Sequence, residues 1–391
     1  MLQAKPTKKQ LDFMDWEVGV FFHFGIRTFY EGHTDWDGVP MDPAAFDPVS
    51  FDAGQWIRTA KAGGARYAVL TAKHHDGFAL WPSAYTEYSV KNTPWRGGKG
   101  DVVREFTEAC RAYGLKTGLY YSPAQFGSRA IEGREYDDYF ISQISELLTD
   151  YGRIDYLWFD GCGSDGHSFD KPRIIRAIRS LQPDILIFNM WDPDTRWVGN
   201  EDGVAPADAR CVQDGAFLPY ECDCKIRPQN WFFSEADAHT LRPLSNIVGL
   251  YDLSVGRGGN LLINIAPDRR GLLPEADAAR FAEFGAYTRA RFANPLDTRL
   301  SQEGDCLFLS SETAAYPRTL VLCEDLTDGE HIEGFTVSYN FGEDILLHAG
   351  TAVGHKRIVS FPPVFIEGGR RIKIEITAHT GAARLKSALL F

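Results

Sequence analysis

Several common functional signatures are missing from this chain of 391 residues. No G-x-G-x-x-G motif follows its early apolar runs, which weakens the case for a nucleotide-binding sheet. The seven cysteines are odd in number, scattered and without a C-x-x-C pair, so neither a disulfide framework nor a cysteine zinc centre is indicated. No segment approaches the roughly 18 apolar residues of a membrane span, and no basic cluster would attract phosphate backbones. We therefore expect no nucleic-acid partner and no membrane partner.

The composition that is present is typical of a folded globular protein. Hydrophobic residues make up 44% and charged residues 24% of the chain, which is long enough for two domains. Lysine and arginine number 41 against 53 acidic residues, and the net charge of −12 favours neutral or cationic partners. Residues 1–19 contain neither the apolar core nor the cleavage site of a signal peptide. We expect a cytoplasmic chain, or a secreted chain whose signal peptide has been removed.

Apolar runs alternate with amphipathic stretches through the first three quarters of the chain. Strands are predicted at 18–25, 65–73, 116–123, 154–161, 184–190 and 260–268, and helices at 53–64, 100–114, 136–152, 171–183 and 274–291. This alternation predicts an α/β fold, a (β/α)8-like barrel of parallel strands, over residues 1–297. Over residues 298–391, short apolar runs separated by Gly, Asp, Asn and Pro predict a C-terminal all-β sandwich domain.

Polar residues gather where the predicted strands end. The ends of the first four strands carry, in order, His23, Lys73-His74-His75-Asp76, Tyr121 and Asp160. In a barrel the carboxyl ends of the strands meet at one face and form the site. Strand alternation places Tyr156, Trp158 and Asp160 on one side, so that a carboxylate and a large aromatic ring enter the same space. An indole beside histidines and a tyrosine is suited to binding a sugar.

Other interpretations of these residues stay open. Asp160 could cap the turn that follows its strand, and Trp36 could be a packing residue. A hydrolytic zinc ion is a further alternative, although no H-x-H or H-E-x-x-H pair supports it. Its ligands would be His23, His74, His75 and Asp160.

Longer motifs carry a resemblance to a known family. They are GVFFHFG, YAVLTAKHHDGFALWPS, GLYYSP, YLWFDG and SVGRGGNLLINIAPDRRG, between about Trp16 and Gly271. In these motifs the chain resembles glycoside hydrolase family 29, the α-L-fucosidases. The resemblance implies a retaining hydrolysis in which Asp160 of WFDG is the nucleophile. It also implies fucose contacts at His23, Trp36, His74, His75, Tyr121 and Trp158.

Two further segments, RWVGNEDG and YECDCKIRP, are similar to the branch of the family that acts on α-1,3- and α-1,4-linked fucose. This similarity places the general acid/base at Glu201, with Glu221 as the alternative. Glu221 or Asp223 is then expected to line the site of the next sugar. Two carboxylates suffice for this chemistry, so neither a cofactor nor a metal ion is expected. The expected partners are fucosylated oligosaccharides or glycoconjugates.

Rival functions stay open on the sequence alone. One is a fucose-binding protein without turnover, and the presence of both Asp160 and Glu201 argues against it. A fucosidase of broad or α-1,2 linkage preference is a second rival, and a glycosidase for another sugar is a third. The sequence gives no expectation for the oligomeric state or for the role of the C-terminal domain.

Overall fold

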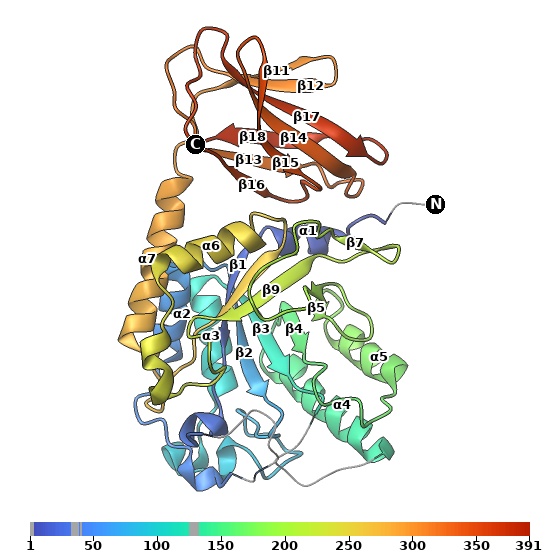
Figure 1. The fold of residues 1–391 in the computed structure, drawn as a ribbon. Helices are drawn as coiled ribbons and strands as arrows, with labels where there is room; N and C mark the ends of the chain where they lie inside the picture. Colours follow the sequence, from blue (N-terminus) through green and yellow to red (C-terminus); the bar gives the residue numbers. More distant parts are fainter. Residues whose placement is uncertain (1–3, 33–38, 40, 125–132) are drawn as a thin grey trace.

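The structure, a computed structural model, combines a barrel of parallel strands with two antiparallel sheets in its C-terminal part (Figure 1). It describes residues 4–32, 39, 41–124 and 133–391. Eight strands form the barrel sheet in the order β5-β4-β3-β2-β1-β10-β9-β6. Each neighbouring pair in this order is parallel.

The barrel strands are short, and helices surround them. The strands are β1 (Val18–Phe22), β2 (Tyr67–Lys73), β3 (Lys116–Tyr121), β4 (Tyr156–Phe159), β5 (Leu186–Phe188), β6 (Arg196–Trp197), β9 (Tyr220–Lys225) and β10 (Asn260–Asn264). The helices are α1 (Lys8–Met14), α2 (Ala53–Ala62), α3 (Val102–Tyr113), α4 (Gly133–Asp150), α5 (Lys171–Leu181), α6 (Leu244–Ser254) and α7 (Glu275–Arg291). A separate hairpin joins β7 (Val212–Gln213) to β8 (Ala216–Phe217). Within the described residues, no helix has the length and apolar character needed to cross a bilayer.

A parallel bridge brings the two outer strands of the barrel sheet together. Phe188, the last residue of β5, pairs with Thr195 immediately before β6. The N–H of Asn189 donates to the carbonyl of Thr195 at 2.9 Å. The sheet is thus nearly closed, and the predicted (β/α)8-like barrel is confirmed.

Aspartates fix where three of the surrounding helices begin. Asp52, Asp101 and Asp170 precede α2, α3 and α5, and each carboxylate accepts the backbone N–H three residues later. Such caps satisfy N–H groups that have no partner inside the helix. At the other end of α3, Gly114 adopts a left-handed conformation with φ of 74°, which turns the chain back into β3. Local sequence therefore sets the helix boundaries that the barrel requires.

Helix α1 plugs the barrel at the amino-terminal ends of its strands. Phe13 packs against Tyr67 and Tyr156 with ring centroids 6.1 and 5.3 Å apart, and Trp16 packs against the same two tyrosines. Gly19 makes room for this packing, because a Cβ at that position would lie 2.4 Å from the Tyr67 ring. Side chains of α1 and the residues after it therefore fill the barrel at the amino-terminal ends of its strands, and the cavity described below opens at their carboxyl ends.

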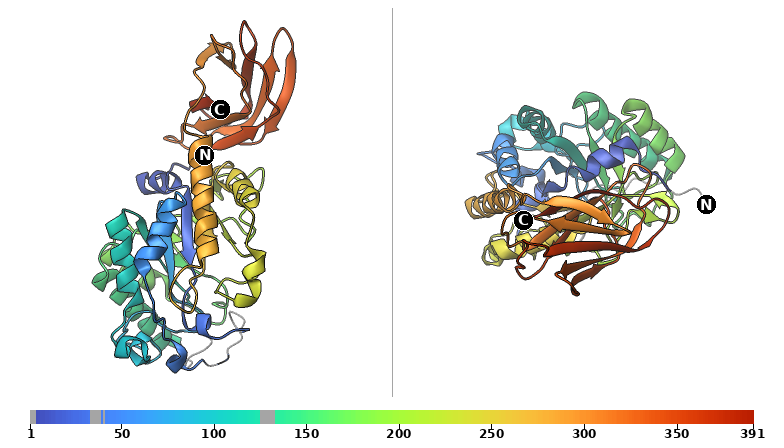
Figure 2. Two further views of the ribbon diagram at one scale, coloured as in Figure 1. Left: turned by 90° about the vertical axis from the view of Figure 1, so that its left-hand side faces the viewer. Right: turned by 90° about the horizontal axis from the view of Figure 1, so that it is seen from above.

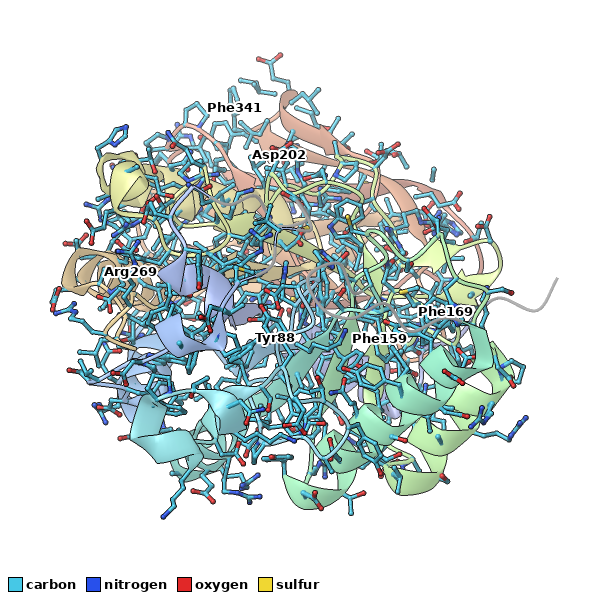
Figure 3. The ribbon with its side chains drawn as sticks, turned by 90° about the horizontal axis from the view of Figure 1, so that it is seen from below. Tyr88, Phe159, Phe169, Asp202, Arg269 and Phe341 are labelled. Carbon is cyan, nitrogen blue, oxygen red and sulfur yellow. The ribbon has the colours of Figure 1, made fainter. Side chains whose placement is uncertain are left out.

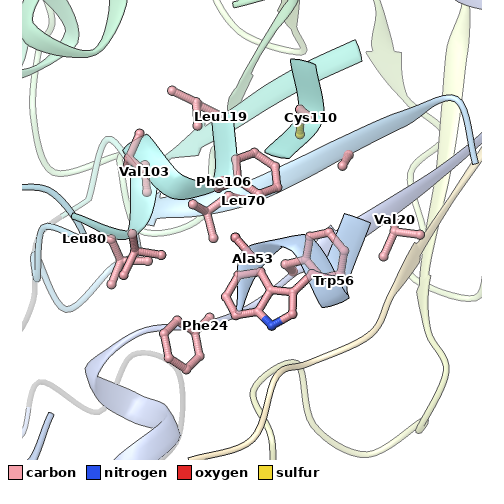
Figure 4. Packing of buried hydrophobic residues seen from close by; sticks show 14 of the residues in the cluster. Val20, Phe24, Ala53, Trp56, Leu70, Leu80, Val103, Phe106, Cys110 and Leu119 are labelled. Atoms are coloured by element: carbon pink, nitrogen blue, oxygen red, sulfur yellow. The ribbon is translucent and has the colours of Figure 1, made fainter. Parts of the chain in front are cut away.

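The outer face of the barrel packs against the helices in a second cluster (Figure 4). Trp56 of α2 lies between Phe22 and Phe24 of the first strand and its loop, at centroid distances of 5.4 and 5.3 Å. Phe106 of α3 contacts Phe22 from the neighbouring helix. Strand residues that point outward therefore hold the helices, and those that point inward are left to fill the barrel.

The C-terminal strands form two antiparallel sheets, as an all-β module requires. One sheet has the order β11-β12-β17-β14-β15 and the other β16-β13-β18. The strands are β11 (Arg299–Glu303), β12 (Cys306–Ser310), β13 (Thr319–Glu324), β14 (Ile332–Asn340), β15 (Asp344–Gly350), β16 (Arg357–Ser360), β17 (Arg371–His379) and β18 (Leu385–Leu390). Both sheets lie at the amino-terminal end of the barrel strands, and α7 runs up toward them (Figures 1 and 2).

Polar contacts fix this position of the C-terminal sheets. The N–H of Ile358 donates to the carbonyl of Gly256 at 2.9 Å, which joins β16 to the end of α6. Arg210 reaches Glu333 at 2.6 Å and the buried Glu330 at 3.6 Å. Burial raises the pKa of Glu330 to about 7, and the nearby charge of Arg210 opposes that rise.

We expect Arg210→Ala to lower the free energy of unfolding by about 2 kcal/mol near pH 8, because it leaves an ionised Glu330 buried without this cation. Since the folded pKa of Glu330 lies above the unfolded value, its contribution to stability is largest below about pH 4.5 and is lost as the pH rises through about 7. The loss in Arg210→Ala should therefore be smaller near pH 5, as measured by denaturant unfolding. Glu333→Gln, which removes an exposed partner, serves as the control. An equal loss at both pH values would contradict this account.

Candidate active site

A cavity of about 370 Å³ opens at the carboxyl ends of the barrel strands. Figure 3 looks onto this end of the molecule and labels Phe159 and Asp202, which neighbour Asp160 and Glu201 in the sequence. The polar side chains that line the cavity are His23, His74, His75, Tyr120, Asp160, Cys162, Asn189, Glu201 and Asp223. Aromatic side chains complete it, namely Phe21, Trp158, Phe188, Trp197 and Trp231.

Asp160 follows β4 directly and is held by three hydrogen-bonding groups. Its Oδ2 accepts the hydroxyl of Tyr120 at 3.0 Å and lies 3.4 Å from Nε2 of His75. Its Oδ1 accepts the backbone N–H of Cys162 at 2.9 Å. Burial opposes ionisation of Asp160, but the interactions with His75, Cys162 and Tyr120 together outweigh burial and lower its pKa. The cavity thus contains a carboxylate that is ionised at neutral pH and fixed in direction.

The histidines at the strand ends are buried and have different partners. Nδ1 of His75 lies 2.6 Å from the hydroxyl of Ser122, and Nδ1 of His23 lies 2.9 Å from the Asn264 side-chain oxygen. Nδ1 of His74 has no hydrogen-bond partner among the described residues. Burial lowers the pKa of His23 to about 3 and that of His74 well below its ordinary value. Both rings are therefore neutral near pH 7, so they can bind hydroxyl groups without presenting a positive charge.

Stacked rings form the floor of the cavity. The indole of Trp158 lies against Phe188, with centroids 4.1 Å apart and planes inclined by 14°. Its other neighbours are Tyr120, stacked at 5.3 Å, and Phe21 at 5.2 Å. The strand register explains this grouping, because Tyr120 pairs with Trp158 and Trp158 with Phe188 across three adjacent strands. Because Phe188 and Tyr120 cover the faces of the indole, the apolar edge of Trp158 is the part that can contact the C–H groups of a sugar.

Strand β9 places two carboxyl groups inside the barrel, Glu221 in its core and Asp223 nearer the cavity. Glu221 is fully buried and accepts hydrogen bonds from Tyr67, Tyr156 and Trp158. Asp223, two residues on, lines the cavity and accepts the indole N–H of Trp197 at 2.7 Å. Burial raises the pKa of Asp223 to about 8, and the charges of Glu221 and Glu201 add to the rise. Asp223 is therefore largely protonated at neutral pH, in contrast to Asp160.

Glu201 lies in the loop after β6 and is about half exposed. Its Oε2 pairs with the ammonium of Lys225 at 3.1 Å and accepts the indole N–H of Trp231 at 3.2 Å. Trp231 packs against His23, and its backbone carbonyl accepts the side-chain N–H of Asn264. Glu201 is thus connected to the strand ends, although the sequence places it on a loop.

A second cavity, of about 510 Å³, adjoins the first at Glu201 and Trp231, which line both. Its other polar lining residues are Arg27, Tyr30, Glu31, Lys225, Gln229, Asn230 and Ser234. The carboxylate of Glu201 therefore lies at the boundary between a pocket with an aromatic floor and a wider, more polar space.

The structure brings most of the predicted site residues to one cavity. His23, His74, His75, Trp158, Asp160, Glu201 and Asp223 all line it. Trp36 lies outside the described residues, so its predicted contact stays a prediction. Within the part of the chain that the structure describes, no group of three or more His, Cys, Asp or Glu side chains has a geometry that could hold a metal ion.

Two predicted contacts are placed elsewhere. Tyr121 points outward into the cluster between the barrel and its helices, where its hydroxyl donates to Gln143 at 2.6 Å. Strand alternation is the reason, since Tyr120 and not Tyr121 shares the inward face with Trp158. Glu221 also lies outside the lining of the cavity. The Trp158 indole, which donates to it, lies between Glu221 and the cavity. The expectations for Tyr121 and Glu221 as sugar contacts are therefore corrected.

Sequence reasoning missed several residues of the site. Tyr120 could have been found, because counting in steps of two from Gly118 along GLYYSP gives the inward residue. Trp197 and Trp231 stand in segments without strand periodicity, and only the tertiary fold places them beside Asp223 and Glu201. Asn264 is a polar residue at the end of β10. It was missed because only the ends of the first four strands were compared.

Comparisons with known proteins were consistent with this geometry. The family model described as Alpha-L-fucosidase matches residues 2–291. "Alpha-L-fucosidase 1" of Arabidopsis thaliana is 32% identical, over 91% of this chain and 81% of that protein. "Plasma alpha-L-fucosidase" of Rattus norvegicus is 29% identical, over 74% of this chain and 72% of that protein. A solved structure, a glycoside hydrolase 29 family member from an unknown rumen bacterium, has a TM-score of 0.92 and 31% identity, and covers 100% of this chain and 77% of its own.

We expect Tyr120→Phe to raise the pKa of Asp160, because it removes a hydrogen bond that favours the ionised carboxylate. Tyr121→Phe is the matched control, since its hydroxyl bonds to Gln143 on the far side of the strand. The measurement is the pH dependence of carbodiimide labelling of Asp160, followed by mass spectrometry of its peptide. Equal labelling curves for wild type and Tyr120→Phe would contradict this assignment.

Proposed function

This chain belongs to the α-L-fucosidase family and is a glycoside hydrolase, and from that premise we propose that it releases α-1,3- and α-1,4-linked fucose from branched glycans. The proposed reaction is a retaining double displacement, in which Asp160 is the nucleophile and Glu201 is the general acid/base. The observation that carries the proposal is the state of Asp160, a carboxylate held ionised at the aromatic floor of the sugar-sized cavity.

In the first step an oxygen of Asp160 attacks the anomeric carbon of fucose as the glycosidic bond breaks. Glu201 gives its proton to the departing glycosidic oxygen, so that the leaving group departs as a neutral alcohol. The two hydrogen bonds to Oδ2 and Oδ1 of Asp160 keep the carboxylate aimed at the cavity. Formation of the ester removes the negative charge of Asp160.

In the second step a water molecule attacks the anomeric carbon of the fucosyl ester. Glu201, now ionised, takes a proton from that water, and Asp160 departs as a carboxylate. Each displacement inverts the anomeric centre, so two of them retain its configuration. The position of Glu201 at the boundary of both cavities supports this double role, because the leaving group and the water must approach from the same side.

Neutral groups around the first cavity support the recognition of an uncharged sugar. His23 and His74 carry no charge at neutral pH, and Nδ1 of His74 has no protein partner among the described residues. Trp158, Tyr120 and Phe21 supply apolar contact. A fucose ring needs both kinds of contact, hydrogen bonds to its hydroxyls and apolar surface for its C–H groups.

The proposed linkage preference rests on the second cavity. It is larger than the first and begins at Glu201, where the leaving group must lie. A branched Lewis-type trisaccharide places two further sugars there, and both need room and hydrogen-bond partners. Gln229, Asn230 and Lys225 offer such partners. Glu221 cannot contribute directly, because it lies within the barrel.

We expect Asp160→Ala to lower the hydrolysis of an aryl α-L-fucoside by at least about 1,000-fold, because the nucleophile is lost. Azide should partly restore turnover by occupying the vacated space, and the product should be the β-fucosyl azide. The anomer is identified by NMR. Near-normal activity without azide would remove Asp160 from the mechanism.

For Glu201→Ala we expect slow breakdown of the fucosyl-enzyme with substrates that have good leaving groups, and rescue by azide to the α-fucosyl azide. The opposite anomer distinguishes the acid/base from the nucleophile. Asp223→Ala is the necessary comparison, because Asp223 also lines the cavity and is protonated at neutral pH. If Asp223→Ala gives the α-azide and Glu201→Ala does not, the acid/base is Asp223.

A Lewis-type trisaccharide should be hydrolysed faster than 2'-fucosyllactose, as measured by the kcat/KM for released fucose. Gln229→Ala should reduce this preference by about 1 kcal/mol without changing the KM of an aryl fucoside, which lacks the sugar hydroxyls that Gln229 would bind. Gln213→Ala, an exposed glutamine of β7 that lines neither cavity, is the matched control. Equal or faster hydrolysis of 2'-fucosyllactose would contradict the linkage proposal and leave the fucosidase activity intact.

A further inference from the structure

Glu221 is a fully buried carboxyl group that no proposed catalytic step uses. It lies inside the barrel beneath the cavity floor and receives three hydrogen bonds. Tyr67 donates to its Oε2 at 2.6 Å, and the Trp158 indole donates to its Oε1 at 2.8 Å. The hydroxyl of Tyr156 lies 3.4 Å from the same Oε1.

Burying a carboxyl group inside the barrel has a free-energy cost. A carboxyl taken out of water loses solvation that hydrogen bonds only partly replace, whereas an apolar side chain of similar size would fill the same volume without that loss. Burial raises the pKa of Glu221 to about 7, which reports the same cost. The hydrogen bonds that Glu221 accepts must therefore supply something that apolar packing does not.

Apolar packing leaves one property of the Trp158 indole unspecified. Stacking between Phe188 and Tyr120 fixes the plane of the ring, but a flip of about 180° about χ2 keeps that plane and exchanges the two edges of the indole. The hydrogen bond from Nε1 to Glu221 has a direction. It therefore determines which edge of the indole points toward the barrel core and which points toward the cavity. Tyr120, stacked on the same indole, donates to Asp160.

We propose that Glu221 is a positioning residue, which holds Trp158 in the one orientation that presents its apolar edge to the sugar at the floor of the cavity. Through Trp158 it also steadies Tyr120 and hence the direction of Asp160. This inference rests on the first cavity being the fucose pocket. It depends neither on the linkage preference nor on which residue is the acid/base.

The test is a double-mutant cycle between Glu221 and Trp158. Glu221→Met removes the acceptor at similar volume, and we expect it to weaken fucose binding by about tenfold, with a similar rise in the KM of an aryl α-L-fucoside. Glu221→Gln should bind fucose within about threefold of wild type, because its carbonyl can accept the indole N–H while its amide donates to Tyr67. In Trp158→Phe, which has no indole N–H, Glu221→Met should cost little further affinity.

Several results would overturn the proposal. They are wild-type fucose affinity in Glu221→Met, an equal loss from Glu221→Met in the Trp158→Phe background, and a Glu221→Gln variant as weak as Glu221→Met. Tyr67→Phe removes a donor to the same carboxyl and leaves Trp158 untouched, so it should bind fucose like wild type. A loss in Tyr67→Phe equal to that in Glu221→Met would assign the effect to general disturbance of the core.

If Glu221→Met does not fold, NMR of protein labelled with ¹⁵N-tryptophan tests the proposal instead. The Nε1–H signal of Trp158 is identified by its loss in Trp158→Phe. It should shift in Glu221→Gln and stay near its wild-type position in Tyr67→Phe. An unshifted signal in Glu221→Gln overturns the proposal. Failure of wild-type protein to bind or hydrolyse any fucoside would instead refute the function itself.

Discussion

Closure of a parallel sheet around a narrow interior is the constraint on which the rest of this structure depends. In this nearly closed barrel every second side chain of each strand must fit inside. Here rings from β2, β4 and α1 fill the half of the barrel at the amino-terminal ends of the strands. The half at the carboxyl ends is filled by Phe21, Tyr120, Trp158 and Phe188. Because all strands are parallel, the residues after them meet at one mouth. The site therefore follows from closure, and its floor is the top of the core.

The same enclosure gives chemically similar groups different charges. Asp160 stands at the mouth with three hydrogen-bonding groups around it, and it stays ionised. Asp223 and Glu221 stand progressively deeper on β9, where burial outweighs their hydrogen bonds and favours the protonated form. Depth in the barrel and the supply of donors thus decide which carboxyl group is ionised near neutral pH.

Much of this architecture is written in local sequence. The apolar runs and the amphipathic stretches predict most barrel strands and their helices, and the polar strand ends predict His23, His74, His75 and Asp160. Periodicity fails where strands are very short. β6 has two residues, and the bridge from Phe188 to Thr195 that nearly closes the barrel leaves no pattern at all. Which of Tyr120 and Tyr121 points inward depends on the register between β3 and β4. The burial of Glu221 beside Trp158 depends on how the interior packs. A single sequence shows neither.

The position of α1 has a consequence for how the chain reaches its folded state. Gln10 of α1 donates to the carbonyls of Asp194 and Phe217, and the carbonyl of Phe13 accepts from Asn260, partners that lie between 184 and 247 residues later. At ribosomal rates of about 5–20 residues per second, the first helix is made on the order of tens of seconds before its last partner. Until β10 leaves the ribosome, the apolar face of α1 has no barrel to enter. The barrel core can therefore be completed only after nearly all of the barrel has been synthesised. Until then, the apolar face of α1 lacks its native partners.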